Sequence, residues 1–123
     1  MAYHNRLPQL IKTLQSIAAQ HPYKEKVEVV IYDDGSSKEH NPSAHINSTL
    51  YPFDIRCVSK PRVAENPCYA YNRAFDMATG EKIIIQNPEC VHVGKIIDCV
   101  AAHLDNNKYL SFSAFSLDKN NTK

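Results

Sequence analysis

The chain has 123 residues, 43% of them hydrophobic, which suffices for one domain with a buried core. Its 14 basic and 13 acidic residues leave a net charge of +1, so nothing in the charge balance favours binding to nucleic acid or to an anionic membrane. No apolar run approaches the roughly 20 residues that span a bilayer, and no signal peptide opens the chain, so we expect no membrane segment.

The first predicted element is an amphipathic helix. Asn5 is a suitable N-cap, and Pro8 falls in the first turn, where its missing N–H does no harm. Apolar residues then recur at helical spacing until Pro22, namely Leu7, Leu10, Ile11, Leu14, Ile17 and Ala18. Such a helix normally follows a strand. Residues 1–3 resemble the end of one, so we expect the first strand to be largely missing.

A buried strand is predicted next, over 27–34. It begins as an apolar, β-branched run and ends in Asp33 and Asp34, a pattern typical of a strand buried on both faces of a parallel sheet. Carboxylates at the carboxyl end of such a strand lie where open α/β sheets bind ligands. The alternative is that residues 33–36 form only a turn, in which Asp34 bonds the backbone of its own loop.

The remaining elements alternate between strands and helices. The polar segment 36–52 is predicted to be a loop with a short helical turn near 44–50. Beyond it we expect a strand at 53–59, a connection at 61–67, a helix at 69–79 stopped by Gly80, a buried strand at 82–86, a helix at 93–104 and a last strand at 109–117. This order predicts an α/β fold: a mostly parallel sheet with flanking helices.

The four cysteines and six histidines form no recognisable ligand pattern. No two cysteines have CxxC spacing, and the histidines are not grouped as zinc ligands are. The chain therefore does not read as a disulfide scaffold, and we expect a reducing compartment and a cytoplasmic location. Association with a membrane surface stays open.

Several of these segments together resemble glycosyltransferase family 2. They are, in chain order, YHNR after Ala2, VEVVIYDDGSS, ENPCYAYNRAFDMATGEKIII and NPE, and they extend from Met1 to about Gly94. A strand ending in DDGS is weak evidence alone, whereas the ordered set is much more specific. The resemblance implies a GT-A fold, a Rossmann-like domain that binds a nucleotide-diphospho-sugar. It further implies inverting transfer of a sugar, with a UDP-sugar as the expected donor, to a hydroxyl of a glycan, lipid or protein.

The resemblance also implies a nucleotide site. In the family, the loop after the first strand packs on uracil, the second Asp of the DDGS motif accepts a hydrogen bond from the base, and the first Asp is nearer the ribose or structural. The segment before the second helix lies along the nucleotide. Carried over position by position, these roles fall on Ala2, Tyr3, His4, Asp33, Asp34, Asn66 and Asn72. Lys60, Arg62 and Arg73 read as solvated cations, of which Arg62 is the candidate for a phosphate contact.

A metal site is implied as well. The family's Asp-x-Asp motif follows the strand that corresponds to 83–86, where this chain has Asn87-Pro88-Glu89. Glu89 would be the direct ligand of Mn²⁺ or Mg²⁺, and Asn87 could add a carbonyl oxygen. Because this pair carries one negative charge instead of two, we expect weaker metal binding than two aspartates would give.

The general base of the family lies in the second half of its domain, and residues 1–123 contain no candidate for it. We therefore expect 1–123 to be a single truncated donor-binding domain that lacks the acceptor half. One alternative is a remnant that binds a nucleotide-sugar but does not catalyse. Another is a nucleotidyltransferase, but such enzymes usually carry an early glycine-rich phosphate loop. Only three glycines occur here, none of them in the opening loop.

Overall fold

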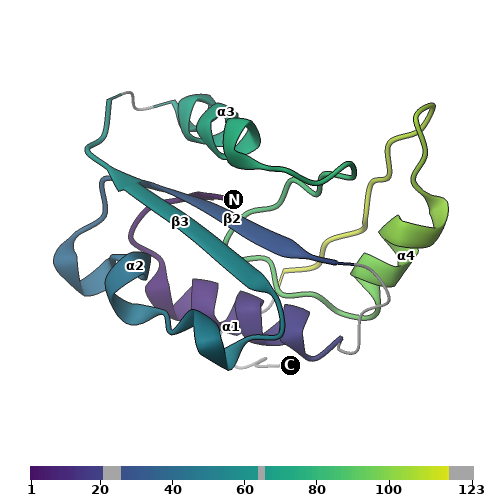
Figure 1. Cartoon of the computed structure of the whole chain (residues 1–123). Helices are drawn as coiled ribbons and strands as arrows, with labels where there is room; N and C mark the ends of the chain where they lie inside the picture. The colour runs from purple at the N-terminus through teal and green to yellow at the C-terminus, as the bar shows by residue number, and fades with distance from the viewer. Residues whose placement is uncertain (21–25, 64–65, 117–123) are drawn as a thin grey trace.

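The computed structural model describes residues 1–20, 26–63 and 66–116, and a parallel sheet lies at its centre (Figure 1). The described part of the sheet has three strands in the order β1–β2–β3, formed by β1 (Ala2–Tyr3), β2 (Glu28–Asp34) and β3 (Asp54–Lys60). β2 pairs with β3 along its whole length. In contrast, β1 pairs only with the carboxyl-terminal part of β2, in the register Ala2↔Tyr32 and Tyr3↔Asp33.

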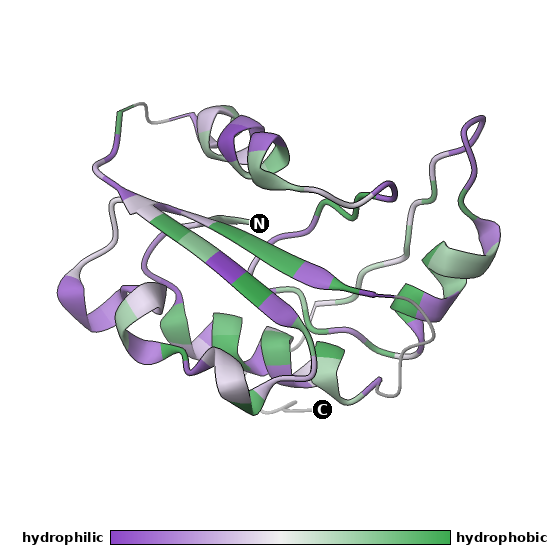
Figure 2. Ribbon diagram, in the orientation of Figure 1, coloured by the Kyte–Doolittle hydropathy of each residue, from purple (hydrophilic) through white to green (hydrophobic). Residues whose placement is uncertain are grey.

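Two helices cover the opposite faces of this sheet. α1 (Leu7–Ala18) lies on one face and α3 (Pro67–Met77) on the other (Figure 1). Because side chains alternate across a strand, β2 contributes to both layers. Its Val29 and Ile31 pack with the α1 residues Leu10, Leu14 and Ile17, whereas its Tyr32 packs with Ala70 and Ala74 of α3. The apolar positions of β2 and α1 are visible in Figure 2.

The rest of the described chain contains several shorter helices and long irregular segments. The connection between β2 and β3 contains a 3-10 turn η1 (Lys38–His40), α2 (Pro42–His45) and a second 3-10 turn η2 (Ser48–Leu50), so the loop is more helical than the sequence predicted. α4 (Ile96–His103) buries Ile97 and Val100. None of the helices in these ranges combines the length and hydrophobicity that crossing a bilayer requires. The four cysteines are free thiols.

The structure confirms the predicted helices near 7–18 and 69–79 and the strands at 27–34 and 53–59. The predicted N-cap was wrong: Arg6 holds that position, while Asn5 has a φ of 48°, a left-handed conformation that asparagine tolerates. The helix predicted at 93–104 is α4, which begins later, at Ile96, after Gly94 with its φ of 88°. Pro22, the predicted end of the first helix, lies outside the described residues.

Two predicted strands were wrong. Residues 82–86 are not a strand, and Ile85 is 73% exposed. Residues 109–116 are not a strand either, and Tyr109 is 90% exposed; position 117 is outside the described residues. The backbone N–H and C=O groups of a strand need hydrogen-bond partners on a neighbouring strand. At the edge of the described sheet, β1 is only two residues long. An apolar run with no ladder partner therefore stays irregular.

Candidate functional site

The candidate site lies at the carboxyl ends of β1 and β2. Their parallel register sets Tyr3 beside Asp33, so that His4 and Asp34 follow on neighbouring strands. The Nδ1 of His4 is 2.7 Å from the backbone oxygen of Asp34. Since a carbonyl oxygen can only accept, Nδ1 carries the proton, and Nε2 is left to accept from Asn5 Nδ2 at 3.3 Å. The hydrogen bond from His4 Nδ1 thus links the carboxyl ends of β1 and β2.

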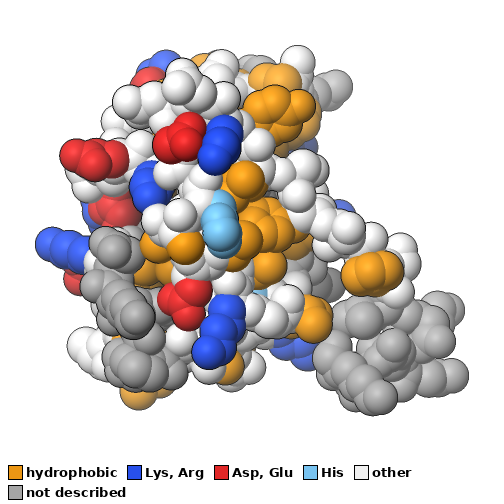
Figure 3. All heavy atoms as spheres, turned by 90° about the vertical axis from the view of Figure 1, so that its right-hand side faces the viewer, with side chains coloured by type: hydrophobic (Ala, Val, Ile, Leu, Met, Phe, Trp, Pro, Cys, Tyr) orange, Lys and Arg blue, Asp and Glu red, His pale blue; other side chains and the backbone are white. Residues whose placement is uncertain are grey.

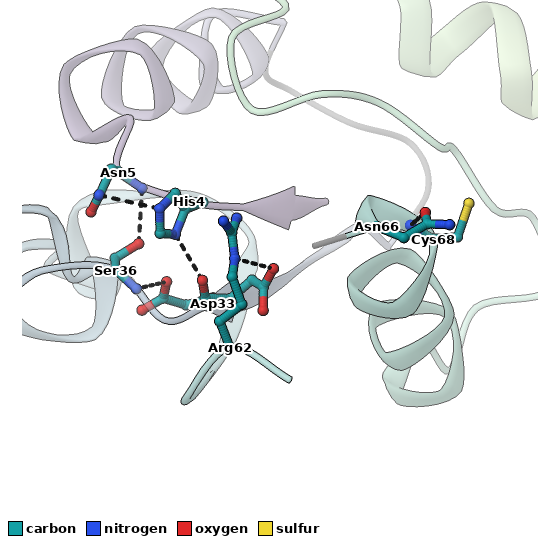
Figure 4. A network of polar contacts seen from close by, with 8 residues as sticks. His4, Asn5, Asp33, Ser36, Arg62, Asn66 and Cys68 are labelled. Atoms are coloured by element: carbon teal, nitrogen blue, oxygen red, sulfur yellow. Dashed lines mark hydrogen bonds and ion pairs between the residues drawn. The ribbon is translucent and has the colours of Figure 1, made fainter. Parts of the chain in front are cut away.

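The loops that follow these strands are also joined to each other. The backbone N–H of Asn5 donates to Ser36 Oγ at 2.9 Å, and the N–H of Ser37 donates back to Asn5 Oδ1 at 2.9 Å. Asp33 is 1% exposed, and its Oδ1 accepts from the N–H of Ser36 at 3.1 Å (Figure 4). Asp33 thus closes the turn after β2, the structural one of the two roles considered for it.

Asp34 presents a carboxylate that is nearly buried and already has a cationic neighbour. Its side chain is 8% exposed, and Oδ2 lies 3.1 Å from Nε of Arg62, which follows β3. Gly35 makes this approach possible, because its φ is 71° and a Cβ there would lie 2.8 Å from the backbone N of Arg62. A carboxylate has about four acceptor positions, so pairing through one Nε leaves capacity for a ligand.

Tyr3 is the residue that anchors the opening loop in the core. Its side chain is 1% exposed and packs in the α1 layer. The hydroxyl donates to the backbone oxygen of His40 at 2.6 Å and accepts from the N–H of Arg6 at 3.2 Å, and burial raises the pKa of Tyr3. The ring is buried and has no free face for uracil, whereas Ala2 and His4, the other two predicted loop residues, are half-buried.

The two predicted asparagines lie on α3, apart from this cluster. Asn66 is the N-cap of α3 and accepts from the N–H of Cys68 at 2.8 Å (Figure 4). Its side-chain oxygen is therefore already used to cap the N-terminus of α3. Asn72 is exposed and lines a separate groove between α3, β2 and the segment 79–86. The structure thus brings together His4, Asp33 and Asp34, but it does not bring Asn72 to them.

The predicted metal ligands lie in a segment fixed between α1 and α3. The Tyr71 hydroxyl of α3 donates to Asn87 Oδ1, and Thr13 Oγ1 of α1 donates to the backbone oxygen of Pro88 at 2.7 Å. Glu89 is exposed. Burial and, to a smaller extent, the negative charge of Glu89 raise the pKa of Tyr71.

These ligands suit a hard cation only in part. No three His, Cys, Asp or Glu residues in the described ranges come together as a metal cluster. Asn87 and Glu89 offer oxygen ligands, however, and Mg²⁺ is commonly held by one or two carboxylates together with substrate phosphates. The donor chemistry therefore fits a cation that is shared with a diphosphate.

Comparison with known proteins adds one decisive match. The sequence model of glycosyl transferase family 2 matches residues 1–121. The chain belongs to glycosyl transferase family 2. No curated protein and no solved structure matches it significantly. As a member of this family, the chain is a glycosyltransferase domain, a class of protein that uses a nucleotide-sugar donor and an acceptor.

Two contacts of this glycosyltransferase domain were not predicted from the sequence. Arg62 had been considered for phosphate, yet it pairs with Asp34, 28 positions earlier in the chain. The hydroxyl of Tyr71 donates to Asn87, which lies 16 positions further along the chain. No local pattern signals either contact, because each joins loops or helices that only the tertiary fold brings together.

Proposed function

We propose that the chain binds the nucleoside part of a nucleotide-diphospho-sugar, with a UDP-sugar as donor, at the carboxyl ends of β1 and β2. The observation that carries this proposal is the nearly buried Asp34 carboxylate at the end of a parallel strand, which pairs with Arg62 while the backbone oxygen of the same residue accepts from His4. Open α/β sheets bind ligands at this end of their strands. Uracil offers a single ring N–H, which a carboxylate oriented in this way can accept.

Each neighbouring residue has a role in this proposal. Asp34 accepts from the base, and Arg62 is a positioning residue, because its Nε fixes one carboxylate oxygen and leaves the other to the ligand. His4 holds the backbone of Asp34 through its Nδ1 proton, while its half-buried ring borders the base. Asp33 keeps the following turn closed through Ser36. The site is therefore largely preformed, which reduces the ordering cost of binding.

The proposed donor site extends to Asn87 and Glu89. These two residues would hold Mn²⁺ or Mg²⁺ together with the diphosphate. Such a cation supplies charge neutralisation for a diphosphate leaving group. In inverting transfer, an acceptor oxygen forms the new bond to the anomeric carbon as the bond to the diphosphate breaks, and the hydroxyl proton passes to a base. We assign that base to none of the described residues.

Titration calorimetry with UDP tests the proposal. We expect saturable binding that strengthens when Mn²⁺ is added, and weaker binding of a nucleotide with a different base, such as GDP. Absence of binding heat for every nucleotide, with and without Mn²⁺, would contradict the proposal. Release of UDP from a UDP-sugar, measured in parallel, separates a catalytic domain from one that only binds the donor.

A further inference from the structure

Polar side chains of α1 hold the segment that carries the predicted metal ligands. Thr13, Ser16 and Gln20 are three and four positions apart, so they lie on one face of the helix. Thr13 Oγ1 donates to the backbone oxygen of Pro88 at 2.7 Å, and Ser16 Oγ accepts from the N–H of His92 at 2.9 Å. Gln20 Nε2 lies 2.7 Å from Nδ1 of the His92 ring. The polar face of α1 thus fixes the chain on both sides of Glu89.

Thr13 makes the most deeply buried of these contacts. Its side chain is 0% exposed, on the same helix that buries Leu10 and Leu14. In a helix, a threonine hydroxyl can bond the carbonyl four residues earlier, whereas here it donates to Pro88, which is itself buried. A buried hydroxyl costs free energy unless it is hydrogen-bonded. This pair therefore anchors the middle residue of the segment 87–89 to α1.

The ring of His92 has one defined arrangement of protons. Gln20 Oε1 accepts from the N–H of Ile97 at 3.2 Å, so Gln20 Nε2 faces His92 Nδ1. On the other side, Gln86 Nε2 donates to the backbone oxygen of Cys90 at 3.1 Å, so Gln86 Oε1 faces His92 Nε2 at 2.6 Å. Nδ1 therefore accepts and Nε2 carries the proton, which makes the ring neutral. A second proton, on Nδ1, would face a donor of Gln20.

The surroundings of His92 favour this neutral form. The side chains that bond its ring, Gln20 and Gln86, are uncharged, and burial lowers the pKa of His92. The charged side chains of the elements around it are exposed, namely Lys12, Glu81, Lys82, Glu89, Lys95 and Asp98. On the side of the molecule where α4 lies, apolar side chains occupy the middle of the surface and charged ones lie around them (Figure 3). Protonation of His92 would therefore oppose the contacts that its ring makes.

We propose that Thr13 and His92 are positioning residues for the cation half of the donor site. These roles rest on the proposed function, in which Asn87 and Glu89 hold Mn²⁺ or Mg²⁺ together with the diphosphate. Thr13 and neutral His92 keep the segment 87–89 in one conformation, in which both of these side chains are exposed. Ligands that are held in place beforehand bind with a smaller ordering cost, and groups that orient metal ligands affect metal affinity.

Titration calorimetry tests the role of Thr13 by comparing the Kd for UDP with and without Mn²⁺. Thr13→Val keeps the shape of the side chain and removes its hydroxyl, whereas Thr13→Ser retains a hydroxyl. Thr49→Val is the control, because Thr49 Oγ1 donates within its own loop, to Asn47 Oδ1 at 2.6 Å. Loss of one hydrogen bond should reduce the strengthening by Mn²⁺ about threefold to tenfold in Thr13→Val. Thr13→Ser and Thr49→Val should retain this strengthening.

The metal-free Kd should stay the same in all three variants. An undiminished strengthening by Mn²⁺ in Thr13→Val, or an equal loss of binding without Mn²⁺, would overturn the positioning role of Thr13.

An NMR titration of the free ¹⁵N-labelled chain tests His92 without nucleotide, cation or a core substitution. It follows the His92 ring and the Ile97 amide from about pH 7.5 down to the pH at which the ring is protonated, past the ordinary histidine pKa of about 6.5. We expect protonation with a midpoint below 6.5 and a shift of the Ile97 amide with the same midpoint, because Gln20 joins the two groups. A midpoint at or above 6.5, or an Ile97 amide that does not shift, would overturn the role of His92.

His92→Gln connects the two measurements. A glutamine amide can accept from Gln20 and donate to Gln86, and it does not titrate. Between the same two pH values, the strengthening of UDP binding by Mn²⁺ should fall several-fold more in the original chain than in His92→Gln, since titration of UDP itself is common to both. An equal fall would overturn the proposal. If no nucleotide binds to any variant, the proposed function fails, while the NMR titration of the free chain still decides whether His92 holds the segment.

Discussion

Replacing Asp34 by asparagine tests the nucleotide site most sharply. The change keeps the size of the side chain and removes its charge. In the free protein it weakens the contact with Arg62, which is 43% exposed, and such partly exposed ion pairs contribute about 0.2–1 kcal/mol. In the complex it replaces a charged acceptor for the base, a hydrogen bond worth about 1.5–3 kcal/mol. The loss in binding should therefore exceed the loss in stability.

The expected magnitude follows from these values. A loss of about 1.5–3 kcal/mol corresponds to a Kd for UDP that is roughly 10- to 150-fold higher. Titration calorimetry measures this Kd, and urea denaturation measures the accompanying change in stability. Arg62→Gln should raise the Kd less, because Arg62 only orients the carboxylate that accepts from the base.

Asp76→Asn is the matched control. Asp76 also pairs with an arginine, since its Oδ2 lies 2.9 Å from Arg73 Nη2, but both side chains are exposed on α3, away from the site. This variant should leave the Kd unchanged. If Asp34→Asn folded normally and bound UDP as tightly as the original chain, Asp34 would not be the acceptor for the base and our assignment would fail.

Two further predictions concern the turn and the cation. Gly35→Ala should lower the free energy of unfolding by about 1–2 kcal/mol in urea denaturation, because its φ is 71° and Arg62 is close, while Gly80→Ala, with its nearest contact at 3.5 Å, should cost little. Glu89→Gln should weaken UDP binding in the presence of Mn²⁺ and leave metal-free binding unchanged; an equal loss without Mn²⁺ would exclude a metal role.

The elements that sequence reasoning recovered are those with strong local signals. The helical spacing from Leu7 to Ala18 and the apolar run of β2 each determine a buried face, and the structure uses both. The failures at 82–86 and 109–116 have a different cause. Their apolar runs resemble strands, but a strand forms only where a neighbour is available, and the sequence of a segment does not reveal its neighbour.

Some features of the candidate site could likewise be predicted from local sequence signals, and others could not. Asp33 and Asp34 could be found because carboxylates directly after a buried strand disrupt the strand pattern. Their separate roles could not, since they depend on Ser36 N–H and on the approach of Arg62 from the loop after β3. Tyr3 was expected at the base, yet the fold uses its ring as a core residue. Contacts between distant loops decided each of these outcomes.

The central claim is that a nucleotide binds at the carboxyl ends of β1 and β2. Its most direct test is an NMR titration of the ¹⁵N-labelled chain with UDP, following backbone amides. We expect the largest shifts at His4, Asp34 and Ser36, with little change at Ile84 in the separate groove. Shifts concentrated at Ile84 and its neighbours, with the amides of His4, Asp34 and Ser36 unmoved at saturation, would contradict the account.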